Sequence, residues 1–522
     1  MTIDGTTLDL DTDVLVIGGG PAGAWAALKA AQSGADVLLV DKGYCGTSGA
    51  TASAGTGVWY VPPEAAAREA AMASREALGG YLADRRWMSR VLDETYDRMN
   101  ELADAGRYPF PVGPDGQQMR TGVQGPEYMR RMRIWIRRAG VRILDHSPVL
   151  ELLTDGAGTV TGAAGYRLRA GHPYRVRAGA VVVATGGCAF LSGALGCDVL
   201  TGDGALFAAE AGAELSGMEF SNAYAIAPAF STVTKTAYYT YASFYREDGS
   251  VLEGAGSQGG RSVIARELLQ RKVYARLDLA DETTQRQMRR GQPNFFLPFD
   301  RRGINPFTDR FEITLLLEGT VRGTGGIHVV DDDCATSVPG LFAAGDAATR
   351  ELICGGFTGG GSHNAAWAMS SGAFAGRAAA RVAGRRTARR GPTLRPAGGA
   401  GLRPTGRPGA AGDHRGLVEL VRGQTHPYQT NYLRSGDGLG AAVAVLDDAW
   451  AEARRTLHAD GVDAYRARQA AAMVAHARWM YRAALSRTET RGMHKRIDHP
   501  DTDPGQHRRQ LVGGLDEVWV RS

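Results

Sequence analysis

The fold is decided by residues 13–25, which read DVLVIGGGPAGAW. The apolar run predicts a buried parallel strand, the glycines predict a tight turn, and the Ala-rich continuation predicts a helix. In this pattern Gly18 permits the turn, Gly20 lets the backbone approach a pyrophosphate, and Gly23 lets the helix pack on the strand. The N–H groups and dipole at the helix start then face the phosphates. The stretch predicts a dinucleotide-binding unit.

A second strand follows at residues 35–40 and ends at Asp41, with Lys42 next to it. An acidic side chain at this place can bind a ribose hydroxyl. The alternative is a Gly-rich turn that binds nothing, but strand, helix and acidic residue together favour the nucleotide.

The bulk composition is that of a sizeable globular enzyme of two or three domains. The chain has 522 residues, 43% of them hydrophobic, and a net charge of only +5, so we expect no nucleic-acid partner. It has no apolar run of about 18 residues, so we expect no membrane span. The N-terminus lacks a signal pattern, and the five scattered cysteines argue against a metal or iron–sulfur site. These features predict a cytoplasmic protein without a metal.

The order of expected elements divides the chain. The β–α rhythm is lost from residue 216 to 324, which predicts an inserted domain, and it returns at Gly325. A stretch rich in Arg, Gly and Pro follows, and a disordered linker is favoured there over a loosely packed surface excursion. Helical periodicity dominates residues 439–487. The expected units are 1–215 and 325–380 (nucleotide binding), 216–324 (inserted), 381–415 (linker) and 416–522 (helical).

Two further motifs fit a flavin nucleotide. The strand 341–344 ends at Gly345 and Asp346, where a carboxylate can accept hydrogen bonds from a sugar-alcohol chain. The Gly-rich loop 359–364 opens an Ala-rich helix, whose N-terminus would stabilise negative charge on a reduced flavin ring. The alternative for this loop is a packing role only.

Together these motifs resemble the succinate dehydrogenase/fumarate reductase flavoprotein superfamily, which also holds L-aspartate oxidase and the adenylylsulfate reductase α-subunit. Besides residues 13–25, the similar stretches are Ala184-Thr185-Gly186-Gly187, Thr201-Gly202-Asp203-Gly204, Met218-Glu219-Phe220, 337–346, 359–364 and Thr488-Glu489-Thr490-Arg491-Gly492-Met493-His494.

The resemblance implies an α/β fold: a Rossmann-like FAD-binding domain interrupted by an α+β capping domain, plus a helical C-terminal domain. It implies FAD as the cofactor. The residues expected to bind it are Gly18, Gly20, Pro21, Ala22, Gly23, Asp41, Lys42, Ser48, Gly49, Thr51, Ser53, Ala184, Thr185, Gly186, Asp203, Gly345, Asp346, Gly361, Ser362, His363 and Asn364.

Departures from the family pattern bear on cofactor attachment and substrate. Respiratory members attach FAD to a histidine, but residues 47–55 contain none, so we expect non-covalent FAD. The histidine that holds a dicarboxylate is replaced by Val321, and an arginine near the Gly-rich helix start by Phe357-Thr358. Without these partners a C4 dicarboxylate would lose several kcal/mol of binding, which makes such a substrate unexpected.

The resemblance leaves one set of catalytic candidates. Arg261 inherits the position of the arginine that shuttles a proton in the family, with Arg266 one helical turn on. Glu253 is what survives of the family's Thr-Glu pair. The spacer between Glu253 and Arg261 is shorter than in the family, and solvated arginines at a helix start are the alternative.

Aromatic residues gather in the capping region, at 238–245 and 295–299. Core packing is favoured for them; if some line the site, the small-molecule substrate is aromatic or apolar.

We therefore expect an FAD-dependent oxidoreductase of the dehydrogenase or oxidase type, with oxygen, nicotinamide or a redox protein as its electron acceptor. A flavin monooxygenase, an electron-transfer subunit similar to adenylylsulfate reductase α, and a non-catalytic FAD-binding protein are the alternatives. A homodimer is compatible with the sequence.

Overall fold

The computed structural model describes residues 7–113, 115–257, 259–358, 360–386, 394–407 and 414–522. Its largest sheet has the strand order β16-β6-β7-β8-β1-β2-β5, and β15 also pairs with β8. Strands β15, β8, β1, β2 and β5 run parallel, and β7, β6 and β16 extend the sheet beyond β8 through successive antiparallel pairings. The strands are β1 (Leu8–Ile17), β2 (Val37–Val40), β5 (Arg142–Leu144), β6 (Val149–Thr154), β7 (Val160–Arg167), β8 (His172–Val183), β15 (Leu341–Ala343) and β16 (Arg395–Pro396).

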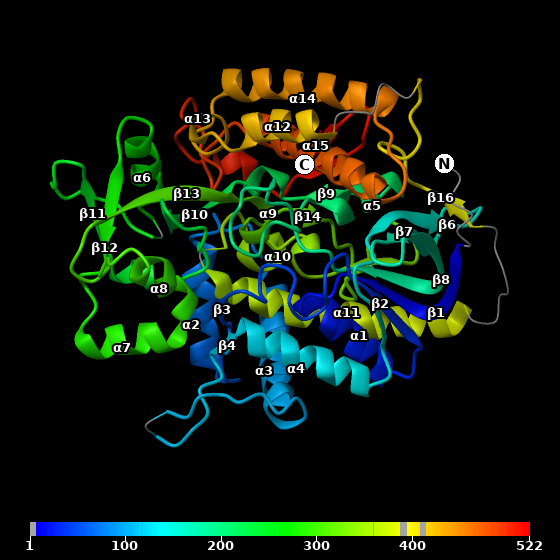
Figure 1. Cartoon of the computed structure of the whole chain (residues 1–522), viewed down its shortest axis with the longest axis horizontal. Coiled ribbons are helices and arrows are strands. Elements are labelled where there is room, and N and C mark those ends of the chain that lie inside the picture. The colour runs from blue at the N-terminus through cyan, green and yellow to red at the C-terminus, as the bar shows by residue number, and fades with distance from the viewer. Residues whose placement is uncertain (1–6, 114, 258, 359, 387–393, 408–413) are drawn as a thin grey trace.

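The glycine turn predicted at residues 18–20 joins β1 to helix α1 (Pro21–Gln32). The long helix α11 (Gly361–Arg386) packs directly on α1. Gly372 and Gly376 make this approach feasible, since a Cβ on them would lie 2.4 and 2.2 Å from carbonyl oxygens of α1. Further helices on this side are α2 (Ala65–Glu76), α3 (Arg85–Asp104) and α4 (Gly125–Arg138), and the short strands β3 (Gly55–Gly57) and β4 (Gly122–Gln124) pair beside them (Figure 1).

Strand β8 runs without a break over residues 172–183. Its first part alternates between buried and less buried residues, as expected where one face of a sheet is covered, and its last four residues form an all-buried run.

The inserted region forms a separate lobe, at the left in Figure 1. An antiparallel sheet in the order β10-β13-β12-β11 packs with three helices around phenylalanine and tyrosine rings. Phe295, Phe296, Phe299 and Tyr239 are nearly inaccessible, so these rings are core as favoured above. The elements are β10 (Ala223–Pro228), β11 (Ser243–Arg246), α6 (Arg261–Leu268), β12 (Val273–Arg276), α7 (Glu282–Gly291), α8 (Pro293–Asp300), β13 (Phe311–Glu318) and α9 (Gly319–Arg322).

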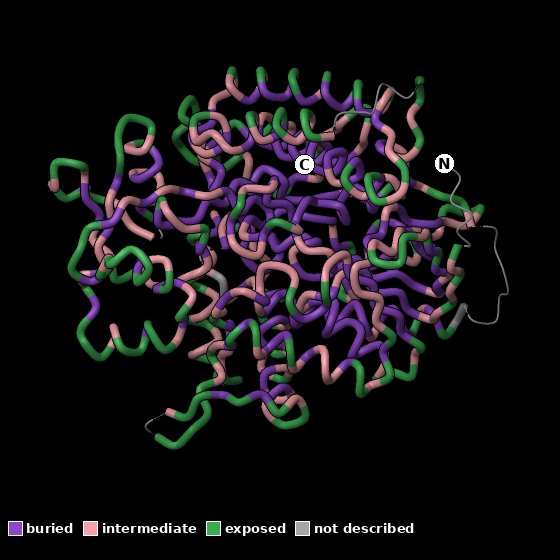
Figure 2. The backbone as a smooth tube through the Cα atoms, in the orientation of Figure 1, coloured by how far each residue is buried: buried purple, intermediate pink, exposed green. Residues whose placement is uncertain are grey.

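The C-terminal part is helical, as its periodicity predicts. Helix α15 is buried along most of its length between the other helices and the main body (Figure 2). The chain end returns as β17 and β18, which join β9 and β14 in a small sheet. The elements are α12 (His414–Thr425), α13 (Tyr428–Asn431), α14 (Gly436–Thr456), α15 (Val462–Ser486), β9 (Leu215–Ser216), β14 (Gly326–Ile327), β17 (Leu511–Gly513) and β18 (Trp519–Arg521).

The segment 381–415, expected as a linker, is packed where the structure describes it. Residues 381–386 end α11, and residues 395–396 form β16 on the edge of the main sheet. Ala400 is 1% exposed and Arg403 forms an ion pair with Glu151, so apolar burial and charge pairing hold residues 394–407 in place. Residues 387–393 and 408–413, also part of that prediction, lie outside the described residues.

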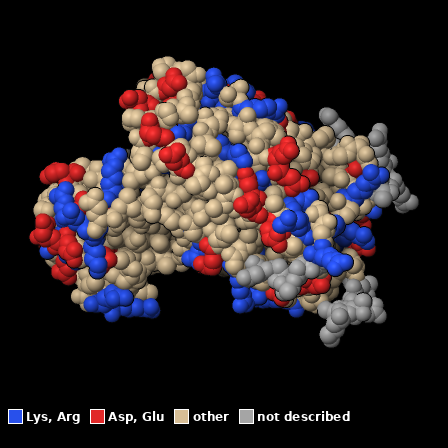
Figure 3. All heavy atoms as spheres, turned by 90° about the horizontal axis from the view of Figure 1, so that it is seen from above, with Lys and Arg blue, Asp and Glu red and all other residues tan. Residues whose placement is uncertain are grey.

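Charge is mixed over the surface seen in Figure 3, where basic and acidic side chains alternate around an uncharged middle. Within the described ranges no helix is long and apolar enough to cross a membrane. The same part of the chain holds no group of three or more His, Cys, Asp or Glu that could bind a metal ion.

Candidate functional site

A cavity lies at the carboxyl ends of the parallel strands β1, β2 and β8, where open α/β sheets bind their ligands. It extends to the capping lobe, because residues 235–237 and Arg261 also line it. Most of the residues predicted to bind FAD share this lining: Gly18, Gly20, Pro21, Ala22, Asp41, Lys42, Ser48, Gly49, Thr51, Ala184, Thr185, Gly186, Asp203, Gly345, Asp346 and Asn364.

The glycines of the first turn have different roles. Gly18 has φ +108°, and a Cβ on it would lie 2.3 Å from the carbonyl oxygen of Ala184. A Cβ on Gly23 would lie 1.8 Å from the oxygen of Gly18, so both residues serve close packing. Gly20 differs, because no atom lies within 4 Å of the place its Cβ would take. That open space on the cavity wall fits a pyrophosphate approaching the backbone.

Asp41 organises the turn as well as facing the cavity. Its carboxylate accepts hydrogen bonds from the amides of Gly19 (2.6 Å) and Gly43 (2.7 Å) and from the hydroxyl of Ser48 (3.0 Å). A carboxylate has about four acceptor positions, so one remains for the ribose hydroxyl predicted here.

The C-terminal helix α15 reaches the same end of the cavity, which the sequence motifs do not indicate. Lys42 forms an ion pair with Asp203 at 2.6 Å, and its ammonium lies 5.9 Å from the centre of the Tyr465 ring of α15. Gln469, one turn further on, donates to the hydroxyl of Thr201 at 3.3 Å. The nucleotide end of the cavity is therefore supported by two distant parts of the chain.

Asp346, expected at the sugar-alcohol chain, is paired with Arg350. Burial raises the pKa of Asp346, and the charge of Arg350 opposes that effect. Arg350 is buried and also donates to the carbonyl oxygens of Thr320 (2.9 Å) and Val321 (3.2 Å). Sequence reasoning missed Arg350, although a helical spacing of four from Asp346 could have indicated it.

The Gly-rich helix start is only partly as predicted. Asn364 lines the cavity and donates to the oxygen of Val321 at 2.9 Å, while Gly361 begins α11. His363 is fully buried against the Trp59 ring, and burial lowers its pKa to about 3, so it is a neutral packing residue. The carbonyl oxygen of Ser362 accepts a hydrogen bond from the Trp59 amide. Ser362, Gly23 and Ser53 were expected to bind FAD but do not line the cavity. Gly359 lies outside the described residues.

Of the three catalytic candidates only Arg261 lines the cavity. It is the first residue of α6 and donates to the carbonyl oxygen of Tyr224 at 3.2 Å, while its Nε has no partner. Burial and the nearby charge of Arg322 lower its pKa to about 10. Arg266 and Glu253 are exposed and do not reach the site. Five residues along a helix rotate a side chain by about 140°, which turns Arg266 away.

Three charged residues at the capping side were missed by sequence reasoning. Glu318 is completely buried and lies 3.0 Å from the ammonium of Lys235 and 3.5 Å from Nε of Arg322. Burial opposes its ionisation, but the two cations outweigh burial and lower its pKa to about 2. Lys235 and Arg322 line the cavity. Because 83 residues separate Lys235 from Glu318, no local pattern could have paired them.

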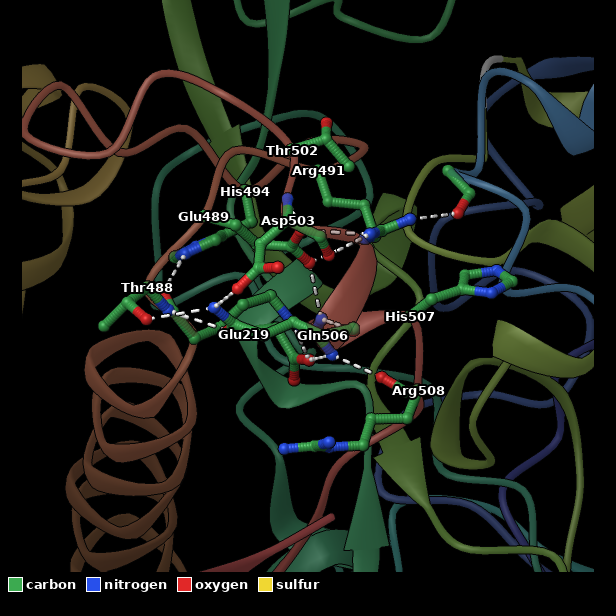
Figure 4. Close-up of polar contacts among 12 residues, drawn as sticks. Glu219, Thr488, Glu489, Arg491, His494, Thr502, Asp503, Gln506, His507 and Arg508 are labelled. Carbon is green, nitrogen blue, oxygen red and sulfur yellow. Dashed lines mark hydrogen bonds and ion pairs between the residues drawn. The ribbon is translucent and has the colours of Figure 1, made fainter.

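A buried ionic network joins the C-terminal part to the rest of the chain (Figure 4). Arg487 pairs with Glu219 and Glu489 at 2.8 Å, and Arg491 pairs with Glu489 at 2.6 Å. Arg491 also donates to the oxygen of Gly80 at 2.7 Å. Arg491 therefore holds the helical part against the flavin-binding part. His494 acts within the C-terminal part: it contacts Arg434 and the carbonyl oxygen of Arg487, and Arg434 in turn donates to the carbonyl oxygen of Glu219 at 2.6 Å.

Comparisons with known proteins agree with this geometry. Residues 13–230 match the FAD binding domain family, and residues 427–515 match the family described as fumarate reductase flavoprotein C-term. An L-aspartate oxidase of Streptomyces coelicolor is 28% identical, covering 96% of this chain and 91% of that protein. A fumarate reductase (CoM/CoB) polypeptide of Methanothermobacter marburgensis is 28% identical over 40% of this chain and 41% of that protein.

Solved structures share the fold over nearly the whole chain. A quinol fumarate reductase of E. coli superposes with a TM-score of 0.81 at 20% identity, covering 99% of this chain and 97% of that one. Adenylylsulfate reductase of Archaeoglobus fulgidus superposes with a TM-score of 0.73 at 16% identity, covering 99% and 96%.

Fold, cavity and matched domains together define an FAD-dependent oxidoreductase. More narrowly, the chain combines the FAD binding domain family with the fumarate reductase flavoprotein C-term family, and it is similar over nearly its whole length to an L-aspartate oxidase.

Proposed function

We propose that this chain oxidises or reduces a small organic substrate by hydride transfer with a non-covalently bound FAD, and that Arg261 moves the accompanying proton. The observation that carries this proposal is that the nucleotide-binding turn and Arg261 line one continuous cavity. FAD bound there would supply the hydride chemistry, and the chain would supply binding, orientation and proton transfer.

The cavity residues fit FAD. Gly20, Gly49 and Gly360 line the cavity, and a Cβ on any of them would meet no protein atom within 4 Å, as expected where a ligand lies against backbone. Asp41 has acceptor capacity for the ribose, and Asp346 lines the cavity, which supports a role for its carboxylate toward the ribityl hydroxyls. None of the described lining residues is a histidine or cysteine, which supports non-covalent attachment.

Arg261 is suited to proton transfer because its environment weakens its hold on the proton. The pKa is lowered to about 10, closer to neutrality than that of a solvated guanidinium. The Nε atom is buried and lacks a protein partner. A proton held on this guanidinium, which lines the cavity, can be given to, or taken from, a carbon next to the hydride-transfer site.

The substrate side differs from what a C4 dicarboxylate needs. Val321 lines the cavity with an apolar side chain at the family's histidine position. Thr358, next to the family's arginine position, is buried and uses its hydroxyl to bond the Arg322 carbonyl oxygen at 2.8 Å. These contacts support a substrate other than succinate, fumarate or aspartate. The buried aromatic rings give no support for an aromatic one.

An anaerobic flavin-reduction assay tests the proposal. The FAD-loaded protein is mixed with small amino acids, 2-hydroxy acids and saturated monocarboxylates, and then separately with NADH and NADPH. We expect bleaching by a member of the substrate panel and no rapid bleaching by nicotinamides. Rapid reduction by a nicotinamide alone, followed by oxygen uptake that depends on an added substrate, would instead establish a monooxygenase.

A further inference from the structure

We propose that Arg322, together with Arg261, binds one anionic group of the substrate, a carboxylate or another oxyanion. The inference rests on the proposed function, because it assigns the substrate class of the same cavity. It differs from the dicarboxylate arrangement of the family in two ways. The substrate has one anionic group instead of two, and the arginine that binds it lies one residue after the position of the family's histidine.

The charges that face this part of the cavity are unbalanced. Lys235, Arg261 and Arg322 are lining cations. Glu318 compensates one positive charge, and the nearby carboxylate of Asp346 is already paired with Arg350. About two positive charges therefore remain without a counter-charge among the described ion pairs. A buried, uncompensated charge is costly, and an anionic ligand relieves that cost.

Lys235 cannot contribute to the ligand, because its three N–H groups are in use. They reach the carboxylate of Glu318 (3.0 Å), the carbonyl oxygen of Leu195 (2.9 Å) and the sulfur of Cys197 (3.1 Å). An ammonium has three donors, so none is left for the cavity. Lys235 is a positioning residue for Glu318, and the two arginines remain to hold a ligand.

Arg322 is fixed in place before any ligand arrives. Arg350 donates to the carbonyl oxygens of Thr320 and Val321, and Thr358 donates to the carbonyl oxygen of Arg322 itself. Glu318 lies against Nε, so the rest of the planar guanidinium keeps its donors for another oxyanion. Its side chain is only 16% exposed, so the interaction is weakly screened by water. Such a preorganised arginine is suited to recognising a carboxylate.

The test measures binding of three probes of similar size to FAD-loaded protein: butyrate, its neutral amide butyramide, and the dicarboxylate succinate. Binding is followed by the flavin difference spectrum and by the shift in Tm. The variants are Arg322→Gln, Arg322→Lys, and the control Arg290→Gln, an exposed arginine on α7. Flavin content and reduction by dithionite are measured first for each protein.

We expect wild type and Arg290→Gln to bind butyrate clearly better than butyramide, and succinate no more than severalfold better than butyrate. Arg322→Gln should weaken butyrate binding by about tenfold or more at unchanged flavin content, with part of the affinity kept in Arg322→Lys. Equal affinity for butyrate and butyramide, or for butyrate in wild type and Arg322→Gln, would overturn the inference. So would succinate binding that is a hundredfold tighter, because it requires two anion sites.

A third result would assign Arg322 to the flavin instead: a changed flavin midpoint potential in Arg322→Gln with unchanged butyrate binding. That result also overturns the inference. Failure of the wild-type protein to take up FAD is a different outcome, since it contradicts the proposed function and not the choice of Arg322.

Discussion

Gly18 and Gly23 are packed so closely that a single methyl group on Gly23 would lie 1.8 Å from the carbonyl oxygen of Gly18. Gly20, between them, faces open space and has φ −72°, a backbone conformation that alanine adopts without strain. The glycines that pack the turn and the glycine that receives the ligand can therefore be separated by experiment.

The first prediction uses this difference. Gly23→Ala should lower the Tm of the flavin-free protein, because α1 must move away from β1. Gly20→Ala should leave that Tm unchanged and weaken FAD binding, because its methyl group fills space meant for the pyrophosphate. Thermal unfolding without FAD and titration with FAD separate the two effects. Unchanged FAD affinity in Gly20→Ala would mean that the ligand does not approach here.

The second prediction concerns proton transfer. Arg261→Gln should slow flavin reduction by a substrate about 10²- to 10⁴-fold, while flavin content stays constant. Stopped-flow absorbance under anaerobic conditions measures this rate constant, with Arg290→Gln as the control. Arg261→Lys should recover part of the rate with a shifted pH profile. A wild-type rate in Arg261→Gln would remove Arg261 from the mechanism.

The third prediction follows from the buried carboxylate of Glu318. Its pKa is lowered to about 2, so its contribution to stability is present above the ordinary carboxyl pKa of 4.5 and is lost as the pH falls toward 2. Glu318→Gln should reduce the free energy of unfolding by about 3 kcal/mol at pH 7, with a penalty that shrinks below pH 4.5.

Urea unfolding at pH 7 and at lower pH measures the Glu318 effect. Glu312→Gln is the matched control: Glu312 also pairs with a lysine, at 2.9 Å, but is 36% exposed. We expect little change there. A penalty equally small at both positions would show that the buried pair does not stabilise the capping side.

The fourth prediction concerns Glu351, which accepts a hydrogen bond from Ser216. Burial and the charge of Glu219 raise the pKa of Glu351 to about 8. Its folded-state pKa is above the unfolded value, so its contribution to stability is complete below pH 4.5 and is lost as the pH rises to 8. Glu351→Gln should remove this loss, so the variant gains Tm relative to wild type between pH 5 and pH 8.5. Glu419→Gln, at an exposed position, should show no such gain in Tm. A wild-type dependence of Tm on pH in Glu351→Gln would contradict the prediction.

Sequence patterns pick out many of the residues that line one end of the cavity, because each of these parts is local. A strand, a glycine turn and an acidic residue 22 positions later are linked by one β–α–β unit, so Asp41 lies against Gly19. The Gly-Asp step at Asp346 is equally local and also reaches the cavity.

The residues at the substrate end of the cavity could not be predicted from local sequence patterns. Glu318 and Arg322 are only four residues apart, but Lys235 reaches Glu318 only because β13 and the loop after β10 lie side by side in the capping lobe. Glu253 was expected there from a short motif, but a motif does not show where its turn points, and this residue is exposed. The packed segment 394–407 was also missed, since its composition is that of a linker and its burial depends on distant partners such as Glu151.

The most direct test of the central claim is the visible spectrum of the protein after loading with FAD and gel filtration, followed by acid precipitation. We predict oxidised-flavin absorbance that stays with the folded protein, bleaches with an anaerobic reductant and is released entirely into the acid supernatant. Protein that carries no flavin absorbance after loading would contradict the claim, and flavin retained in the acid pellet would contradict its non-covalent form.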